Sequence, residues 1–279
     1  MSSRLRHRAD KTATHLILAV GALVVILPFL FMASTSLKSR TQVLEYPPRL
    51  LPTAPNLDNY VEVIRAEQFG VYFVNSLIVA VAATGLTLLV STLLAYGFAR
   101  FEFRWKEPVF YGLLLGMMIP PVMLIIPQFL VARNLGLLNS LLGLIVVYVT
   151  MNLALQTFLL RGFFEDIPRE LEEAAVIDGA APGTILWRII IPLSRPGLAV
   201  VAIFTFLYAW DEFPWAHVAI QETSKRTLPI AIALFHGQYS TQWGLVFAAS
   251  IIALLPVVVV FVFFQRYFIR GVSTSGIKG

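Results

Sequence analysis

The chain has 279 residues, of which 58% are hydrophobic and 13% are charged, and its formal net charge is +5. Soluble domains carry roughly 25% charged residues, so this composition excludes an ordinary soluble enzyme and indicates a protein that folds in a lipid bilayer. Because the sequence has no cysteine and its four histidines lack metal-ligand spacing, a disulfide framework, a zinc site and a thiol nucleophile are also excluded.

Six apolar runs are each long enough for a membrane-spanning helix, which needs about 20 residues. They cover residues 13–35, 73–98, 109–131, 141–160, 196–220 and 245–264. Backbone amides in hydrocarbon must be paired within the protein, and the alternating pattern of a membrane barrel is absent. We therefore predict an all-α membrane protein with six transmembrane helices in a single domain over residues 1–279.

The first run follows a basic cluster and resembles a secretory signal peptide in that respect. The apolar part of a signal peptide is about 7 to 15 residues long, whereas this run continues past that length. We expect it to be retained as the first helix.

Lysine and arginine residues indicate the orientation of the chain. If both termini are cytoplasmic, two thirds of the 21 Lys and Arg residues lie on the inner side, as is usual for cytoplasmic loops. We predict cytoplasmic termini, with the proline-rich segment 37–71 as an extracytoplasmic loop. The same bias accounts for the positive net charge, so we expect no nucleic-acid partner.

The inner loop 161–195 is far longer than a connection between two helices requires. Asp166 and Pro168 indicate the start of a short helix, and Asp178-Gly179 indicates its end. A second short helix is predicted to begin near Pro182 and to end before Pro192.

On the first loop helix, Ala174, Ala175 and Asp178 share one face. Small side chains allow another protein to approach the helix closely, so the loop is a candidate docking element. A solvated hairpin without a partner is the alternative.

The fifth run contains Asp211 and Glu212, although a charge at the centre of a spanning helix costs about 2.5–3.5 kcal/mol. These side chains must face water or another subunit. Pro214 lacks a backbone donor, so we expect the helix to bend or open there.

Tyr208, Asp211 and Trp215 share one helix face, and aromatic rings beside a carboxylate suit a sugar. Packing of Asp211 and Glu212 against another subunit, or a position at the outer mouth, is the alternative. In the fourth run, polar residues recur every four positions and either line a pathway or bond between helices. The candidate pathway residues are Tyr148, Asn152, Gln156, Tyr208, Asp211, Glu212 and Trp215.

The inner loop contains Glu173-Ala174-Ala175, then Asp178-Gly179-Ala180, then Ile189, Ile191 and Pro192. This pattern resembles the EAA loop of ABC importer permeases. Residues 117–121, 135–139 and 209–213 are similar to the carbohydrate-importer permeases, particularly the MalG-like type. The similarity extends from about Asn56 to the C-terminus, although the family commonly carries Asn where this chain has Asp211.

The resemblance implies the type I ABC importer permease fold and a role for the inner loop. In that family this helix sits in a cleft of a cytoplasmic ATPase and couples nucleotide-driven closure to movement of the membrane helices. The implied coupling residues are Glu173, Ala174, Ala175, Asp178, Gly179 and Ala180. The C-terminal tail, residues 271–279, would also reach the ATPase.

The resemblance implies a transmembrane permease subunit of an ATP-driven, binding-protein-dependent sugar importer in a prokaryotic cell membrane. Its partners would be a second permease subunit, two copies of a cytoplasmic ABC ATPase, an extracytoplasmic sugar-binding protein, the sugar and membrane lipid. The chain has no phosphate-binding Gly-x-x-x-x-Gly-Lys-Ser/Thr motif. We therefore expect ATP and Mg²⁺ in the ATPase partner, and neither a cofactor nor an enzyme activity in this chain.

Two other functions stay open at this stage. An ion-gradient-driven secondary transporter would need no ATPase, but the EAA-like loop and the lack of a visible paired repeat disfavour it. An intramembrane enzyme or receptor scaffold would use Asp211 and Glu212 as an acid and base pair. Adjacent helical residues point about 100° apart, which suits joint catalysis poorly.

Overall fold

A computed structural model describes residues 3–66, 68–237 and 241–275. The chain forms two compact units, unit 1 from Met1–Phe69 and Ile232–Leu254, and unit 2 from Gly70–Ala231 and Leu255–Gly279. Across the described residues the secondary structure is helical, apart from one isolated bridge between His236 and Thr241. The predicted all-α fold is confirmed.

The described residues contain four helices that are long and apolar enough to cross a membrane, and two bent helix pairs that bring the number to six if each pair is one span. The four are Lys11–Ser36, Phe69–Arg100, Leu141–Glu165 and Trp243–Gln265. The bent pairs are Lys106–Met118 with Pro121–Asn134 and Pro182–Leu193 with Arg195–Asp211. This agrees with the predicted polytopic membrane protein.

Unit 1 contains α1 (Ser3–Ser36), α2 (Arg40–Val43), α3 (Asp58–Arg65) and the first part of α14 (Trp243–Ser275). The short helix α2 begins because Ser39 accepts a hydrogen bond from the Gln42 amide while the Gln42 side chain accepts one from the Ser39 amide. Asn59 donates to the carbonyls of Ser36 and Lys38 at 2.8 Å each, which ties α3 to the end of α1.

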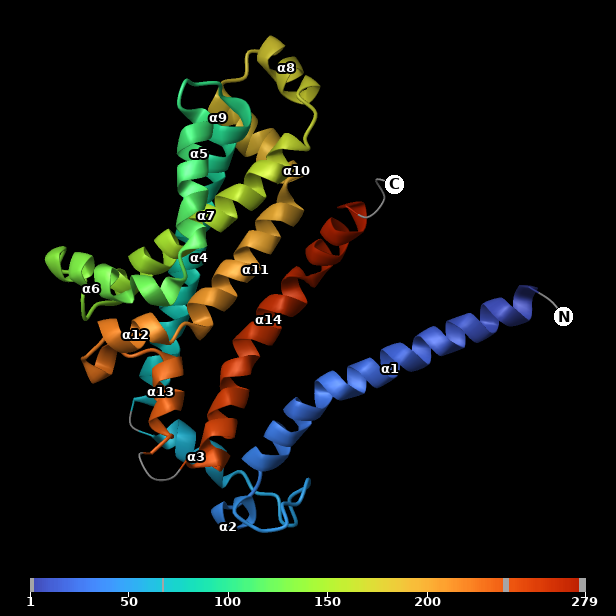
Figure 1. The fold of residues 1–279 in the computed structure, drawn as a ribbon, viewed down its shortest axis with the longest axis vertical. Coiled ribbons are helices and arrows are strands. Elements are labelled where there is room, and N and C mark those ends of the chain that lie inside the picture. The colour runs from blue at the N-terminus through green and yellow to red at the C-terminus, as the bar shows by residue number, and fades with distance from the viewer. Residues whose placement is uncertain (1–2, 67, 238–240, 276–279) are drawn as a thin grey trace. The chain divides into compact units, whose positions relative to one another are not determined.

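Unit 2 contains the elements on which the function depends (Figure 1). They are α4 (Phe69–Arg100), α5 (Lys106–Leu115), η1 (Gly116–Met118), η2 (Pro121–Leu124), α6 (Ile125–Asn134), α7 (Leu141–Glu165), α8 (Glu170–Ile177), α9 (Pro182–Ile185), η3 (Leu186–Ile190), α10 (Ile191–Leu193), α11 (Arg195–Asp211), α12 (Pro214–Ala219) and η4 (Thr223–Lys225). The helix α13 (Leu228–Leu234) crosses the boundary between the two units. Within unit 2, Figure 1 shows α8 at one end and α12 towards the other, with α7 and α11 running between them.

The predicted third span, 109–131, differs from the structure. Its two halves, Lys106–Met118 and Pro121–Asn134, meet at a bend of 96°. Ile119 and Pro120 have extended ψ angles of 120° and 130°, because each precedes a proline, which disfavours helical backbone.

The predicted fifth span, 196–220, is also divided. α11 ends at Asp211, Glu212 is extended, and α12 begins at Pro214. Pro214 supplies no amide proton to α11 but is well suited to the first turn of a new helix.

The second loop helix continues beyond the predicted end before Pro192. Helical backbone runs through Leu193, because the wide π turn of η3 (Leu186–Ile190) precedes Pro192 and places it in the first turn of α10, where its missing amide proton is tolerated. The prediction of a stop at Pro192 was therefore wrong.

An apolar cluster joins the last turns of α4 and α7 to the segment around η3. Its buried members include Tyr96 and Ala99 of α4, Leu160 and Phe164 of α7, and Ile190. Packed side chains have low compressibility and transmit strain from one element to the next. The cluster therefore forms a common base for the loop that contains α8.

Candidate functional site

The helix α8 has acidic residues at its N-terminal end and a glycine at its C-terminal end. Glu170, Glu172 and Glu173 lie in the first turn, where they complement the positive end of the helix dipole. Gly179 has a φ of +81°, and the amides of Gly179 and Ala180 bond back to Val176 and Ala175 at 2.9 Å. This turn needs glycine because L side chains rarely adopt such a φ.

The six predicted coupling residues divide into two groups by exposure. Glu173, Ala174, Asp178 and Gly179 are exposed, whereas Ala175 and Ala180 are half-buried against the apolar cluster. The first group is available to a partner and the second holds the hairpin.

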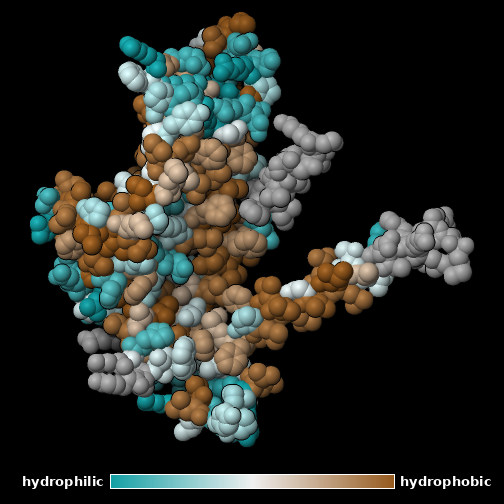
Figure 2. All heavy atoms as spheres, in the orientation of Figure 1, coloured by the Kyte–Doolittle hydropathy of each residue, from teal (hydrophilic) through white to brown (hydrophobic). Residues whose placement is uncertain are grey.

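Two residues that sequence reasoning did not single out complete the exposed surface. Val176 and Ile177 are 60% and 86% exposed, although both are apolar. Figure 2 shows this end of unit 2 as mostly hydrophilic, with hydrophobic residues at its tip. Apolar side chains that are exposed to water are typical of a contact surface for another protein. The sequence feature that could have identified these two residues is their position directly before Asp178-Gly179.

The last turn of α4 holds the hairpin at three points. Arg100 forms an ion pair with Glu172, and these side chains are only 7% and 13% exposed. Arg100 also donates to the carbonyl of Ile167 at 3.0 Å, and the Tyr96 hydroxyl donates to the carbonyl of Pro182 at 3.3 Å. Sequence reasoning counted Arg100 only as an inner charge and missed this contact.

The anchored hairpin leaves a hollow beside it. A cavity of about 480 Å³ lies between the end of α4 and α8, and Arg100, Phe101, Glu173 and Ile177 are among its lining residues. The exposed face of α8 and this cavity together form a surface suited to a docked protein segment.

The break between α11 and α12 is held by Glu212. Its carboxylate accepts hydrogen bonds from the amides of Trp215 and Ala216 at 2.7 and 3.0 Å, and from the Tyr148 hydroxyl at 2.7 Å. Amides of a first helical turn have no partner within their helix, so Glu212 satisfies two of them and ties α12 to α7.

A cavity of about 300 Å³ opens at the same break. Its lining includes Tyr208, Asp211, Glu212 and Trp215, together with Met151 of α7. Asp211 is exposed, and no described residue forms a hydrogen bond or an ion pair with its carboxylate. The cavity therefore combines aromatic walls with one free carboxylate.

The structure places the polar stripe of α7 in two environments. Tyr148 reaches Glu212, and its ring lies edge-on to that of Tyr208 with the centroids 6.0 Å apart. Asn152 and Gln156 are buried and do not line the cavity. Asn152 donates to the carbonyl of Tyr148 at 2.8 Å, whereas both amide atoms of Gln156 lack a partner among the described residues.

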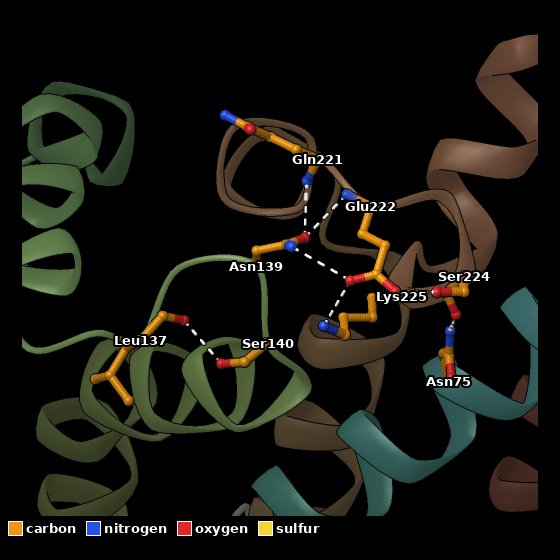
Figure 3. A network of polar contacts seen from close by, with 8 residues as sticks. All are labelled: Asn75, Leu137, Asn139, Ser140, Gln221, Glu222, Ser224 and Lys225. Atoms are coloured by element: carbon orange, nitrogen blue, oxygen red, sulfur yellow. Dashed lines mark hydrogen bonds and ion pairs between the residues drawn. The ribbon is translucent and has the colours of Figure 1, made fainter.

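The far end of α12 is held by Asn139, in the connection between α6 and α7 (Figure 3). Its amide donates to the carbonyl of Ala219 at 2.8 Å, and its side-chain oxygen accepts from the amides of Gln221 and Glu222 at 3.3 and 2.9 Å. The hydrogen bond from Lys225 lowers the pKa of Glu222. Sequence reasoning used Asn139 only within a family motif and missed this role.

Comparisons with known proteins agree with this architecture. The family described as the binding-protein-dependent transport system inner membrane component matches residues 87–274. The chain is 35% identical over 254 residues to the sulfoquinovosyl glycerol transport system permease protein SmoH of Agrobacterium fabrum, covering 91% of this chain and 89% of that protein. It is 34% identical over 256 residues to the trehalose transport system permease protein SugB of Mycobacterium tuberculosis, covering 91% and 93%.

A solved structure gives the same result. The chain is similar to a chain of a bacterial ABC transporter involved in the import of the acidic polysaccharide alginate, with a TM-score of 0.82, 25% identity, and coverage of 96% of this chain and 99% of that one. The resemblance to ABC importer permeases is thus confirmed, and a secondary transporter and an enzyme are excluded. The chain belongs to the family of binding-protein-dependent transport system inner membrane components, as a membrane-embedded permease subunit of an ABC importer.

Proposed function

We propose that this chain is one of two permease subunits of an ATP-driven, binding-protein-dependent sugar importer and forms half of its translocation pathway. The named relatives transport sulfoquinovosyl glycerol, trehalose and, in the solved structure, alginate, which supports a carbohydrate substrate. The assembly would add a second permease, two cytoplasmic ATPases and an extracytoplasmic sugar-binding protein.

The observation that carries the proposal is the separation of two sites within unit 2. The exposed hairpin of α8 lies at one end and the cavity at the break between α11 and α12 lies away from it, while α7 and α11 connect them (Figure 1). A subunit that couples a cytoplasmic motor to a pathway in the membrane requires this arrangement.

At the hairpin, the exposed Glu173, Ala174, Asp178 and Gly179 would contact the ATPase, while Ala175 and Ala180 keep the helix on its base. The hairpin and both termini would be cytoplasmic, and segment 37–71 would lie outside. ATP and Mg²⁺ would bind to the ATPase, and this chain would hold no cofactor of its own. The tail contact proposed for residues 271–279 lies partly outside the described residues.

At the cavity, Tyr208 and Asp211 would contact the sugar; Trp215 borders the cavity but is 1% exposed, so it would contact the sugar only after a movement of α12. Aromatic faces pack on the C–H surfaces of a sugar ring, and the Asp211 carboxylate accepts from hydroxyl groups. Glu212 and Tyr148 would fix the position of α12. Asn152 and Gln156 would not contact the sugar in this conformation, because they are buried away from the cavity.

Coupling would proceed as a population shift between two arrangements of the permease. Closure of the ATPases around ATP would move α8, and the Arg100–Glu172 ion pair would pass that movement to α4. The apolar cluster would carry α7 and α11 along and change access to the cavity. Hydrolysis would restore the starting arrangement.

Uptake by the purified assembly in proteoliposomes tests the proposal. Sugar should accumulate only when ATP and the binding protein are both present, and an ion gradient without ATP should give no uptake. Accumulation driven by an ion gradient alone would contradict the proposed function. Loss of uptake with Gly179→Leu, but not with Gly183→Ala, would show that uptake depends on the turn after α8. Gly183→Ala is the control because, of these two glycines, Gly179 alone has a positive φ.

A further inference from the structure

Unit 1 contains a cavity that the transport function does not use. It has a volume of about 260 Å³ and lies among the end of α1, the loop around α2 and the beginning of α14. Phe31, Thr35, Lys38, Trp243 and Phe247 are among its lining residues. All of them belong to unit 1.

The cavity contains a buried cation without a counter-ion. Lys38 is only 4% exposed, and no carboxylate among the described residues forms an ion pair with it. Its ammonium donates to the carbonyl of Arg49 at 2.5 Å and lies 5.7 Å from the centroid of the Phe31 ring. Buried charges are normally paired, and Glu45, in the same loop, is already paired with Arg49. An anionic ligand would balance the charge of Lys38 in this environment.

A second polar group in the same cavity also lacks a partner. Thr35 is 4% exposed, and its hydroxyl oxygen is buried without a hydrogen-bond partner among the described residues. Leaving a buried hydroxyl unpaired is destabilising. A ligand with acceptor oxygens would satisfy both the Thr35 hydroxyl and the remaining protons of Lys38.

Aromatic rings form the apolar wall. Phe247 packs edge-on against Phe31 with the centroids 6.3 Å apart, and its ring is tilted by 31° relative to that of Trp243 with the centroids 5.6 Å apart. The site thus offers a cation and a hydroxyl on one side and apolar rings on the other. This combination suits a molecule whose anionic head is joined to an apolar body.

The position along the helices indicates where that molecule comes from. The apolar span of α1 ends at Ser36 and that of α14 begins at Trp243, so the cavity lies where hydrocarbon gives way to water. The side chains of residues 11–31 are exposed along α1, and Figure 2 shows the coloured part of α1 as mostly hydrophobic, with hydrophobic and hydrophilic residues mixed around α2. Tryptophan is enriched at this level of the membrane.

We propose that this cavity binds the headgroup phosphate of an anionic phospholipid. Lys38 supplies the charge, the Thr35 hydroxyl donates to a phosphate oxygen, and Trp243 packs against the glycerol and the upper acyl chain. Free phosphate shares the headgroup chemistry but lacks the apolar part.

Native mass spectrometry of the full transporter assembly tests the proposal, with phosphatidylglycerol titrated into a neutral detergent. Lys38→Gln should lower the affinity for one phosphatidylglycerol molecule by roughly fivefold to tenfold, which is the effect of one basic residue at an anionic membrane surface. Thr35→Val, which preserves shape, should weaken it by a smaller factor. Arg40→Gln is the matched control, because Arg40 is exposed in the same segment but does not line the cavity.

Four further results decide between these sources. Phosphatidylcholine should not occupy the site, and millimolar inorganic phosphate should compete with phosphatidylglycerol only weakly. Equal phosphatidylglycerol binding by the Lys38→Gln and Arg40→Gln proteins would overturn the proposal. Loss of a neighbouring subunit from the Lys38→Gln assembly, with lipid binding unchanged, would also overturn it and assign the site to a carboxylate of that subunit. If Lys38→Gln does not assemble, Thr35→Val and Lys38→Arg carry the test.

Discussion

Each of the two sites in unit 2 contains an adjacent pair of acidic residues, and in each pair one member is held while the other is free. At the hairpin, Glu172 pairs with buried Arg100, whereas Glu173 is exposed. At the break in the fifth span, Glu212 accepts three hydrogen bonds, whereas Asp211 has no partner among the described residues.

The difference lies in how the held residue is satisfied. Glu172 is balanced by a full positive charge on another helix. Separating α8 from α4 would leave each of these two buried charges without its partner. Glu212 is balanced by three neutral donors, so the loss of any one of them costs less than the loss of a partner in a buried ion pair. We call the hairpin contact the stiff joint because breaking it costs more, and the contact at the cavity the adjustable joint because its donors can be lost one at a time.

Breaking the stiff joint should have the largest effect. Arg100→Ala leaves Glu172 buried without its partner, and loss of one partner of a buried pair costs about 3–5 kcal/mol. We expect a large fall in the thermal unfolding temperature of the assembly and transport that is lost more strongly than ATP hydrolysis. Lys106→Ala, which breaks the more exposed pair with Glu102, should cost at most about 1 kcal/mol. Equal effects of the two variants would contradict the comparison.

Loosening the adjustable joint should have the next largest effect. Glu212→Gln keeps one acceptor but loses the charge, and a hydrogen bond to a charged group is worth about 1.5–3 kcal/mol. We expect a moderate loss of stability and a lower maximal transport rate, measured by thermal unfolding and by uptake. Tyr148→Phe removes a single donor and should reproduce part of this loss; an unchanged rate in both variants would show that α12 is held by other contacts.

The second clamp on α12 should have a smaller effect. Asn139 has a φ of +55°, so Asn139→Gly keeps the backbone conformation and removes only the side-chain bonds to Gln221 and Glu222. We expect a rise of about twofold to fivefold in the KM for sugar uptake, equivalent to roughly 0.5–1 kcal/mol. Asn139→Asp preserves the acceptor but replaces the nitrogen that donates to Glu222 with a carboxylate oxygen, so it should raise the KM at least as much as Asn139→Gly. An unchanged KM in both variants would show that α12 is positioned without this network.

The smallest effect on stability is expected at Asp211. No described residue forms a hydrogen bond or an ion pair with its carboxylate, so Asp211→Asn should change the free energy of unfolding by no more than about 0.5 kcal/mol. The KM for the sugar should nevertheless change, since the carboxylate would accept from substrate hydroxyl groups. A stability loss as large as that of Glu212→Gln would show that Asp211 is a structural residue.

The membrane class and the six apolar runs could be predicted from sequence because hydrophobic length is a local property. The break near Pro214 could also be anticipated, since proline acts on its own helix. The stop predicted before Pro192 was wrong because the π turn of η3, which precedes it, depends on packing in the apolar cluster. Arg100 and Asn139 were missed for the same reason, since their partners lie 72 and more than 80 positions away in the chain.

The exposure of Glu173 and Ala174 beside an anchored Glu172 could not be predicted from the sequence pattern either. Nothing in the sequence says which of Glu172, Glu173 and Ala174 faces the protein and which faces solvent, because this is determined by the packing of α4 against α8. The loop pattern therefore identified the coupling segment, and the tertiary contacts determined which residues are available to a partner.

The most direct test of the account uses the absence of cysteine from the chain, which makes single-cysteine variants unambiguous. Ala174→Cys should be crosslinked to the ATPase subunit in the assembled transporter and should resist a membrane-impermeant maleimide added to intact cells. Glu222→Cys, near the far end of α12, should react with that maleimide and should not crosslink. Labelling of Ala174→Cys from outside the cell, or its failure to crosslink in an active assembly, would contradict the assignment of α8 as the element coupled to ATP hydrolysis.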